Sequence, residues 1–155
     1  MSKIYITGKH LGEVLHHKGG GTFMKKILIP LDGTERSMHS IDLVKNLYKK
    51  DEVEIVLLYV KEDVNNVIME YDLTAAETEM QGVAAPALKE LNGYKVSCEF
   101  GLIDAGSEII KRAQMNEIDI IIMTKSTKKG LTRMIGSVTS YVVRNAPCIV
   151  MIVPE

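Results

Sequence analysis

Short apolar runs alternate with helix-forming segments along most of the chain, and this alternation is the feature that most constrains the fold. Residues 26–31 and 119–123 are nearly continuous apolar runs, as expected for strands buried on both faces. Residues 54–60, 95–100 and 148–153 are further strand-like runs. Apolar residues recur at helical spacing between these runs. Such alternation predicts parallel strands joined by right-handed helical crossovers.

The weakest of these runs and the last one suit the edges of the sheet. Residues 95–100 alternate polar and apolar side chains, and residues 148–153 form the final apolar run. With these two strands at the edges, the strand order is 3-2-1-4-5. We therefore predict an α/β domain over residues 24–155, with a doubly wound, five-stranded parallel sheet of Rossmann-like type and helices on both faces.

The first 23 residues differ from the rest in composition. They contain three of the four histidines, a short apolar stretch at 4–6 and a glycine run at 19–21. Lys18-Gly19-Gly20 can be encoded by bases that resemble a bacterial ribosome-binding site shortly before Met24. We therefore expect residues 1–23 to be a leader that takes no part in the fold.

Composition limits the function classes that the chain can serve. Hydrophobic residues make up 46% and charged residues 25%, which is typical of a globular domain. The formal net charge of −1 provides no general attraction to nucleic acid or to anionic lipid. No apolar run reaches the roughly 18 residues of a membrane-spanning helix, and the first residues lack the features of a signal peptide. We expect a cytoplasmic protein with no nucleic-acid or membrane partner.

Open parallel sheets bind ligands beyond the carboxyl ends of their strands, where the winding direction reverses. In the predicted order this switch lies between the strands at 26–31 and 119–123. Asp32 directly follows the first of them. It suits a turn or a helix N-cap, and it equally suits a carboxylate that accepts hydrogen bonds from a ribose or a base. The residues alone leave both interpretations open.

Gly136 and Ser137 open the last predicted helix on the other side of this switch. Backbone N–H groups, the helix dipole and a serine hydroxyl together form a seat for an anion. The alternative is simple capping, with Ser137 as the N-cap. The preceding loop contains a cluster of cations that is either a solvated surface or a phosphate-facing set: Lys125, Lys128, Lys129 and Arg133.

The residues predict no catalytic centre. His39 stands alone on the first predicted helix, and no serine or cysteine has a general base near it in sequence. Asp104 precedes a predicted helix, where a structural role is expected. We assign no catalytic residue and no metal ligand, and the strongest enzymatic interpretation is a slow ATPase.

Several blocks, in the same order along the chain, resemble the universal stress protein family. Residues 27–37 (ILIPLDGTERS) are similar to its opening strand and turn, "ILVPVDGSE-S". Similar blocks occur at 57–60 (second strand), 119–123 ("DLIVMG"), 130–138 ("GL-R-LLLGSV") and 145–153 ("APCPVLVV"). The resemblance runs from Met24 to Pro154 and implies the adenine-nucleotide alpha-hydrolase-like fold.

The resemblance also implies a nucleotide site, with one departure from the family's pattern. Nucleotide-binding members carry Gly-x2-Gly-x9-Gly-Ser/Thr around the phosphates, and only the final pair is kept here. Counting back from Gly136 places Met123 and Ser126 in the two leading glycine positions, whereas counting forward from the strand places Thr124 and Thr127 there.

Carried over position by position, Asp32 would contact the ribose and base, Val60 the adenine, and residues 136–139 the phosphates. The complete set of implied binding residues is Pro30, Leu31, Asp32, Val60, Met123, Thr124, Thr127, Gly136, Ser137, Val138 and Thr139.

The lost glycines predict weak binding. A residue with a Cβ in a left-handed position costs roughly 1–2 kcal/mol, so two such sites would weaken binding about ten- to a thousandfold. We expect an adenine nucleotide (ATP, ADP or AMP, with or without a divalent cation) to bind at about tens of micromolar or more weakly, in a stress response or signalling role. The alternative is the branch of the family that binds no nucleotide and serves as a dimeric interaction or signalling module.

The last strand predicts the assembly. Residues 148–153 form an apolar edge strand, and a bare edge of this kind favours pairing. The family resemblance also implies a dimer at this strand. We expect a homodimer in which the strand pairs antiparallel with its own copy, together with a signalling partner that the sequence does not identify.

Overall fold

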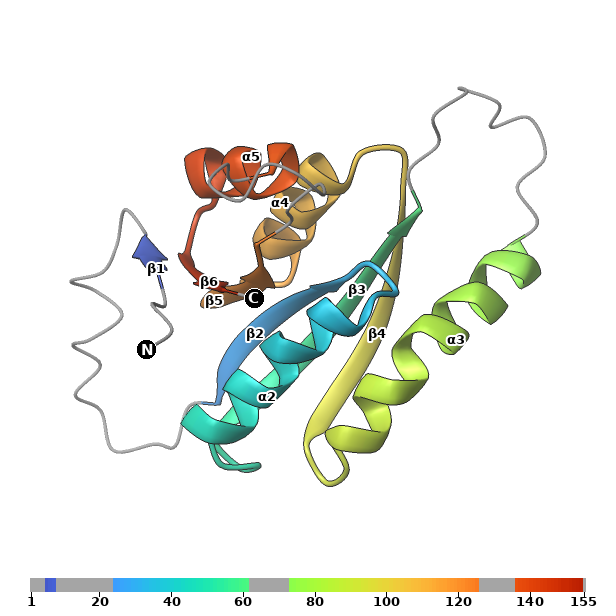
Figure 1. Ribbon diagram of the computed structural model, residues 1–155, viewed down its shortest axis with the longest axis horizontal. Helices are drawn as coiled ribbons and strands as arrows, with labels where there is room; N and C mark the ends of the chain where they lie inside the picture. The colour runs from blue at the N-terminus through green and yellow to red at the C-terminus, as the bar shows by residue number, and fades with distance from the viewer. Residues whose placement is uncertain (1–4, 8–23, 62–72, 126–135, 155) are drawn as a thin grey trace.

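The computed structural model describes residues 5–7, 24–61, 73–125 and 136–154 (Figure 1). Within them one sheet has the strand order β1-β6-β5-β2-β3-β4. The last five of these pair in parallel and are β2 (Lys25–Leu31), β3 (Val53–Lys61), β4 (Lys95–Leu102), β5 (Ile120–Thr124) and β6 (Ile149–Val153). Numbered along the chain, they have the order 3-2-1-4-5, which confirms the predicted fold class.

Helices cover both faces of this sheet, and the side chains of each strand alternate between two cores. The short 3-10 helix η1 (Glu35–Ser37), α2 (Met38–Leu47) and α3 (Leu73–Glu90) follow β2 and β3, whereas α4 (Ala105–Met115) and α5 (Ser137–Asn145) lie on the opposite side (Figure 1). Ile27 and Ile29 pack in the core beneath α2 and α3, and Leu28 packs in the core beneath α4 and α5. Burial on both faces explains why the run in β2 is almost continuously apolar.

The sheet also has a strand that the sequence did not predict. β1 (Tyr5–Thr7) pairs antiparallel with the outer edge of β6, with Tyr5 opposite Ile152 and Thr7 opposite Val150. The expectation that the leader takes no part in the fold therefore fails at these three residues, and the edge of β6 is not bare. An aromatic and two β-branched residues suit a strand, and an unpaired edge of β6 would accept one. The rest of the leader lies outside the described residues.

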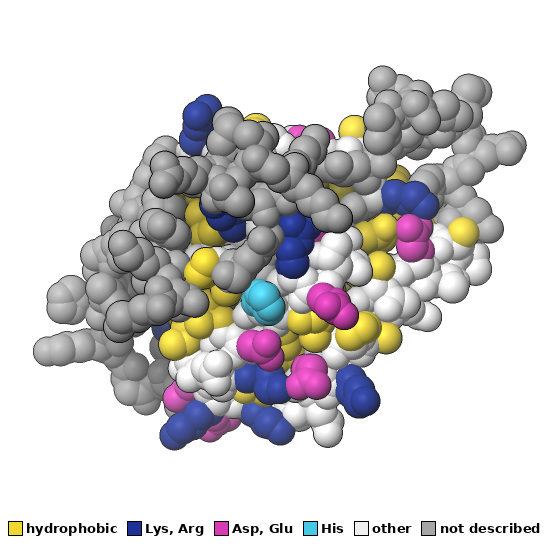
Figure 2. Space-filling model, in the orientation of Figure 1, with side chains coloured by type: hydrophobic (Ala, Val, Ile, Leu, Met, Phe, Trp, Pro, Cys, Tyr) yellow, Lys and Arg dark blue, Asp and Glu magenta, His cyan; other side chains and the backbone are white. Residues whose placement is uncertain are grey.

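The described surface is mixed in charge. On the side where α2 lies, Lys and Arg side chains are interspersed with Asp and Glu (Figure 2), in keeping with the net charge of −1. No helix in the described ranges combines the length and the hydropathy needed to cross a bilayer.

Candidate functional site

A cavity of about 490 Å³ lies at the carboxyl ends of the parallel strands. Its wall is built by the ends of β2, β3 and β5 together with the first turns of α4 and α5. This is the switch point predicted from the strand order, because β2 and β5 are neighbours whose helices leave toward opposite faces. Sites for small ligands are typically about 300–1,000 Å³, so the cavity has a suitable size.

The structure brings nine of the eleven implied binding residues together around this cavity. They are Pro30, Leu31, Asp32, Val60, Met123, Thr124, Ser137, Val138 and Thr139. Gly136 is the N-cap of α5 and is not part of the wall. Thr127 and Ser126 lie outside the described residues, as do Lys128, Lys129 and Arg133 of the cationic cluster.

Asp32 holds the turn after β2. Its Oδ1 atom accepts hydrogen bonds from the Thr34 backbone N–H at 3.0 Å and from the Thr34 hydroxyl at 2.6 Å, and its Oδ2 atom lies 3.8 Å from the Arg36 guanidinium. Gly33 between them has φ +77°, a conformation that favours glycine. The turn interpretation is therefore confirmed. A carboxylate offers about four acceptor positions, so the half-exposed Asp32 can also accept from a ligand in the cavity.

The first residues of α5, Ser137, Val138 and Thr139, line the cavity. Gly136 is its N-cap, with extended backbone, and among the described residues no side-chain hydrogen bond caps the helix. The alternative interpretation, with Ser137 as the N-cap, is therefore wrong, because Ser137 already belongs to the first turn. The first N–H groups of an α-helix have no partner within the helix, and together with the positive end of its dipole they favour an anion at such a position.

The side chain of Thr139 reinforces this polar end of the cavity. Thr139 lines the wall and is fully buried, and its hydroxyl has no hydrogen-bond partner within the described part of the chain. Leaving a buried hydroxyl unpaired typically costs about 1–3 kcal/mol. A site with such a group is one that a ligand with hydrogen-bonding oxygens would complete.

The β3 side of the cavity contains a polar cluster that the sequence reasoning missed. Tyr59 and Lys61 line the wall on either side of Val60. Glu79 of α3 accepts a hydrogen bond from the Tyr59 hydroxyl at 2.8 Å and forms an ion pair with Lys61 at 2.6 Å. Lys61, and then Tyr59, hold the pKa of Glu79 below its usual value through these hydrogen bonds. Tyr59 and Lys61 adjoin Val60 in β3, and their position next to an implied binding residue is the signal by which the sequence could have revealed them.

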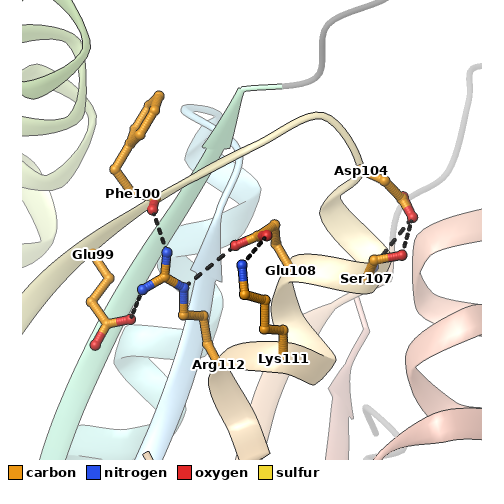
Figure 3. A network of polar contacts seen from close by, with 7 residues as sticks. All are labelled: Glu99, Phe100, Asp104, Ser107, Glu108, Lys111 and Arg112. Atoms are coloured by element: carbon orange, nitrogen blue, oxygen red, sulfur yellow. Dashed lines mark hydrogen bonds and ion pairs between the residues drawn. The ribbon is translucent and has the colours of Figure 1, made fainter. Parts of the chain in front are cut away.

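A second polar network fixes α4, which contributes Ala105 and Ile109 to the cavity wall. Arg112 donates to the Phe100 carbonyl at 2.9 Å and forms ion pairs with Glu99 and Glu108, which ties α4 to β4 (Figure 3). None of the seven residues drawn in Figure 3 lines the cavity. This network is structural.

Asp104 is the N-cap of α4 and lies apart from the contacts of Arg112 (Figure 3). It accepts hydrogen bonds from the backbone N–H groups of Gly106 and Ser107 and from the Ser107 hydroxyl. The Ser107 hydroxyl is the main reason that the pKa of Asp104 lies below its usual value, and the two backbone donors act in the same direction. The structural role expected for Asp104 is confirmed.

The cavity offers no metal site of its own within the described residues, since no group of three or more His, Cys, Asp or Glu side chains converges there or elsewhere in these ranges. Fold and cavity together define the class: a doubly wound α/β domain in which a carboxylate, Asp32, and the first residues of α5 line one crevice at the strand ends. The chain belongs to the universal stress protein family, whose model matches residues 24–154.

Individual relatives agree with this assignment. The chain is 29% identical over 150 residues to universal stress protein MJ0531 of Methanocaldococcus jannaschii, a match that covers 89% of this chain and 86% of the relative. The solved structure of hypothetical protein MJ0577 is 26% identical, with a TM-score of 0.65, and the match covers 84% of this chain and 96% of that one.

Two more distant solved structures contain a nucleotide. A universal stress protein in complex with cAMP has a TM-score of 0.65, and the match covers 84% of this chain and 97% of that one. A family protein from Arabidopsis thaliana with AMP bound has a TM-score of 0.59, with coverages of 84% and 92%. Each is 13% identical to this chain, so the likeness establishes a common fold.

Proposed function

We propose that this protein acts in the cytoplasm, in a stress response or in signalling, by binding an adenine nucleotide weakly in the cavity at the strand ends. The observation that carries the proposal is the fully buried hydroxyl of Thr139 at the N-terminus of α5: within the described residues this hydroxyl has no hydrogen-bond partner and no side chain caps the helix. Both features call for an anionic, oxygen-rich group at one end of the cavity. Support also comes from the two family structures that contain cAMP and AMP.

The rest of the cavity suits the other parts of a nucleotide. Asp32 directly follows β2 and lines the cavity, so its carboxylate can accept hydrogen bonds from ribose hydroxyls. Leu31, Leu58 and Val60 contribute apolar wall for a base. A phosphate would then lie against residues 137–139, at the positive end of the α5 dipole.

The structure changes the reason to expect weak binding. Whichever way the motif is counted, its first glycine position falls on Met123 or Thr124, and both belong to β5. Neither has positive φ, so the strain penalty expected from the sequence does not apply there. A Cβ at this position instead keeps a phosphate from approaching the backbone closely. We therefore retain an affinity of about tens of micromolar or weaker.

Titration calorimetry with ATP, ADP and AMP tests the proposal, and Thr139→Val is the most informative variant. Valine keeps the shape and removes the hydroxyl, so affinity should fall about two- to tenfold. The ligand-free variant should nevertheless melt at a higher temperature, because a buried unpaired group is gone. This pairing of opposite effects is not expected of a purely structural threonine.

Ser40→Ala is the matched control. Ser40 of α2 has the only other fully buried, unpartnered side-chain hydroxyl among the described residues, and it does not line the cavity. Its replacement should leave affinity unchanged. Equal losses in the two variants, or no loss in Thr139→Val, would remove the basis of the proposal. An absence of heat with every nucleotide at millimolar concentration would favour the interaction module.

A further inference from the structure

The hydrogen bonds between β6 and β5 determine which backbone groups of β6 face its outer edge. The Ile149 backbone N–H donates to the Asp119 carbonyl, and the Val153 carbonyl accepts from the Lys125 N–H. Because backbone groups alternate in direction along a strand, residues 149, 151 and 153 face β5. The backbone N–H and C=O groups of Val150 and Ile152 therefore point away from β5.

β1 occupies this outward-facing set of groups. Its antiparallel register places Tyr5 opposite Ile152 and Thr7 opposite Val150. These two are hydrogen-bonded pairs, in which both residues exchange N–H and C=O contacts. Ile6, opposite Met151, directs its own backbone groups away from β6. The chain thus satisfies the edge of β6 with a strand from its own N-terminal region.

The family resemblance implies a dimer at the last strand, and we propose that β1 blocks this pairing in cis by occupying the outer edge of β6. β6 (Ile149–Val153) is entirely apolar, without the proline, charge or bulge by which natural edge strands discourage pairing. An antiparallel pair of β6 strands related by a two-fold axis is self-complementary and closes as a dimer. The same outward-facing groups cannot bind β1 and a second β6 together, so the two pairings exclude each other.

The covalent connection strongly favours β1 over a second copy. Seventeen residues separate Thr7 from Lys25, and at 3.3–3.6 Å per residue they reach at most about 60 Å. The three strand spacings from β2 to β1 are only about 14 Å. A tether of this length gives an effective concentration in the millimolar range. If the free chains are at about 10 μM, the effective concentration of β1 at this edge is roughly a hundredfold higher than that of a second β6.

Proline substitutions in the full-length chain separate the two pairings. Tyr5→Pro with Thr7→Pro removes both β1 backbone donors that face β6 and should release the strand. Ile6→Pro is the matched control, since its N–H faces away from β6. In sedimentation equilibrium, the double variant should dimerise ten- to a hundredfold more tightly than the unchanged chain, whereas Ile6→Pro should match the unchanged chain.

Three results would overturn the proposal: equal dimerisation of the unchanged chain and the double variant, dimerisation of Ile6→Pro to the extent of the double variant, or a double variant that stays monomeric. Amide hydrogen exchange at low protein concentration gives an independent readout. The Val150 and Ile152 amides should exchange at least tenfold faster in the double variant, while those of Ile149 and Met151 stay protected. Unchanged protection at Val150 and Ile152 would show that β1 does not hold this edge.

Discussion

Replacing either of two helical glycines, Gly82 and Gly106, with alanine should change the stability of the protein in opposite directions. Gly82 lies on the exposed side of α3, and a Cβ there would meet nothing within 4 Å. Gly106 lies in the first turn of α4, and a Cβ there would come within 2.8 Å of Tyr141 Cδ1 and 3.1 Å of Tyr141 Cγ in α5. The close packing of α4 on α5 therefore depends on the missing side chain at Gly106.

The magnitudes follow from these distances. Alanine is better than glycine in a helix by about 1 kcal/mol, so Gly82→Ala should raise the melting temperature by roughly 2–4 °C for a chain of this size. The same gain applies to Gly106→Ala, but overpacking against Tyr141 costs about 1–3 kcal/mol. The net effect should be a loss of up to about 2 kcal/mol, because Cγ and Cδ1 of Tyr141 lie close to its own backbone and cannot move away alone.

Thermal unfolding followed by circular dichroism measures both variants. Adding Tyr141→Ala to Gly106→Ala removes the clash, so the double variant should recover at least about 1 kcal/mol relative to the sum of the single changes. A Gly106→Ala protein as stable as Gly82→Ala would refute the described contact between α4 and α5. That result would also contradict the placement of α5, whose first residues line the cavity.

Three further predictions concern the polar networks and the thiols. Arg112→Leu should destabilise the protein by about 1–3 kcal/mol in urea unfolding, because the Phe100 carbonyl and the carboxylates of Glu99 and Glu108 each lose the Arg112 donor. Lys111→Ala removes only an exposed ion pair, so it should change stability by less than about 0.5 kcal/mol. The lowered pKa of Asp104 stabilises the folded state above the ordinary value of 3.8 and ceases to do so as the pH falls through the folded pKa. Asp104→Asn should therefore lose less stability than the unchanged chain between pH 5 and pH 3, and an equal loss would contradict the capping role. Burial raises the pKa of the Cys148 thiol to about 12, so iodoacetamide at pH 8 should label Cys98 first in the native protein and both thiols in urea.

The strands and the location of the cavity could be predicted because burial on both faces leaves a direct trace in the sequence. Ile27, Leu28 and Ile29 are all fully buried, and a short, continuous apolar run of this kind is typical of a central parallel strand. The switch point then follows from topology rules, which is why Asp32 and Ser137 could both be assigned to one crevice, and both line the cavity.

Other features depend on information that is not local. β1 has three residues, too few to show a period of two, and its pairing depends on the edge of β6. Gly136 and Ser137 are both acceptable N-caps by residue type, and only the backbone angles of Gly136 decide between them. The contact of Gly106 with Tyr141 joins two helices that are distant in sequence, and no spacing rule connects them.

The central claim is that an adenine nucleotide binds at the carboxyl ends of the strands, and a titration of the ¹⁵N-labelled protein with AMP tests it most directly. The amide resonances of residues 137–139 and of Asp32 and Val60 should shift together and saturate at millimolar AMP. The amides of Lys95 and Val53, at the opposite ends of their strands, should stay in place. Saturable shifts centred on those opposite ends, or no shifts at millimolar AMP, would contradict the claim.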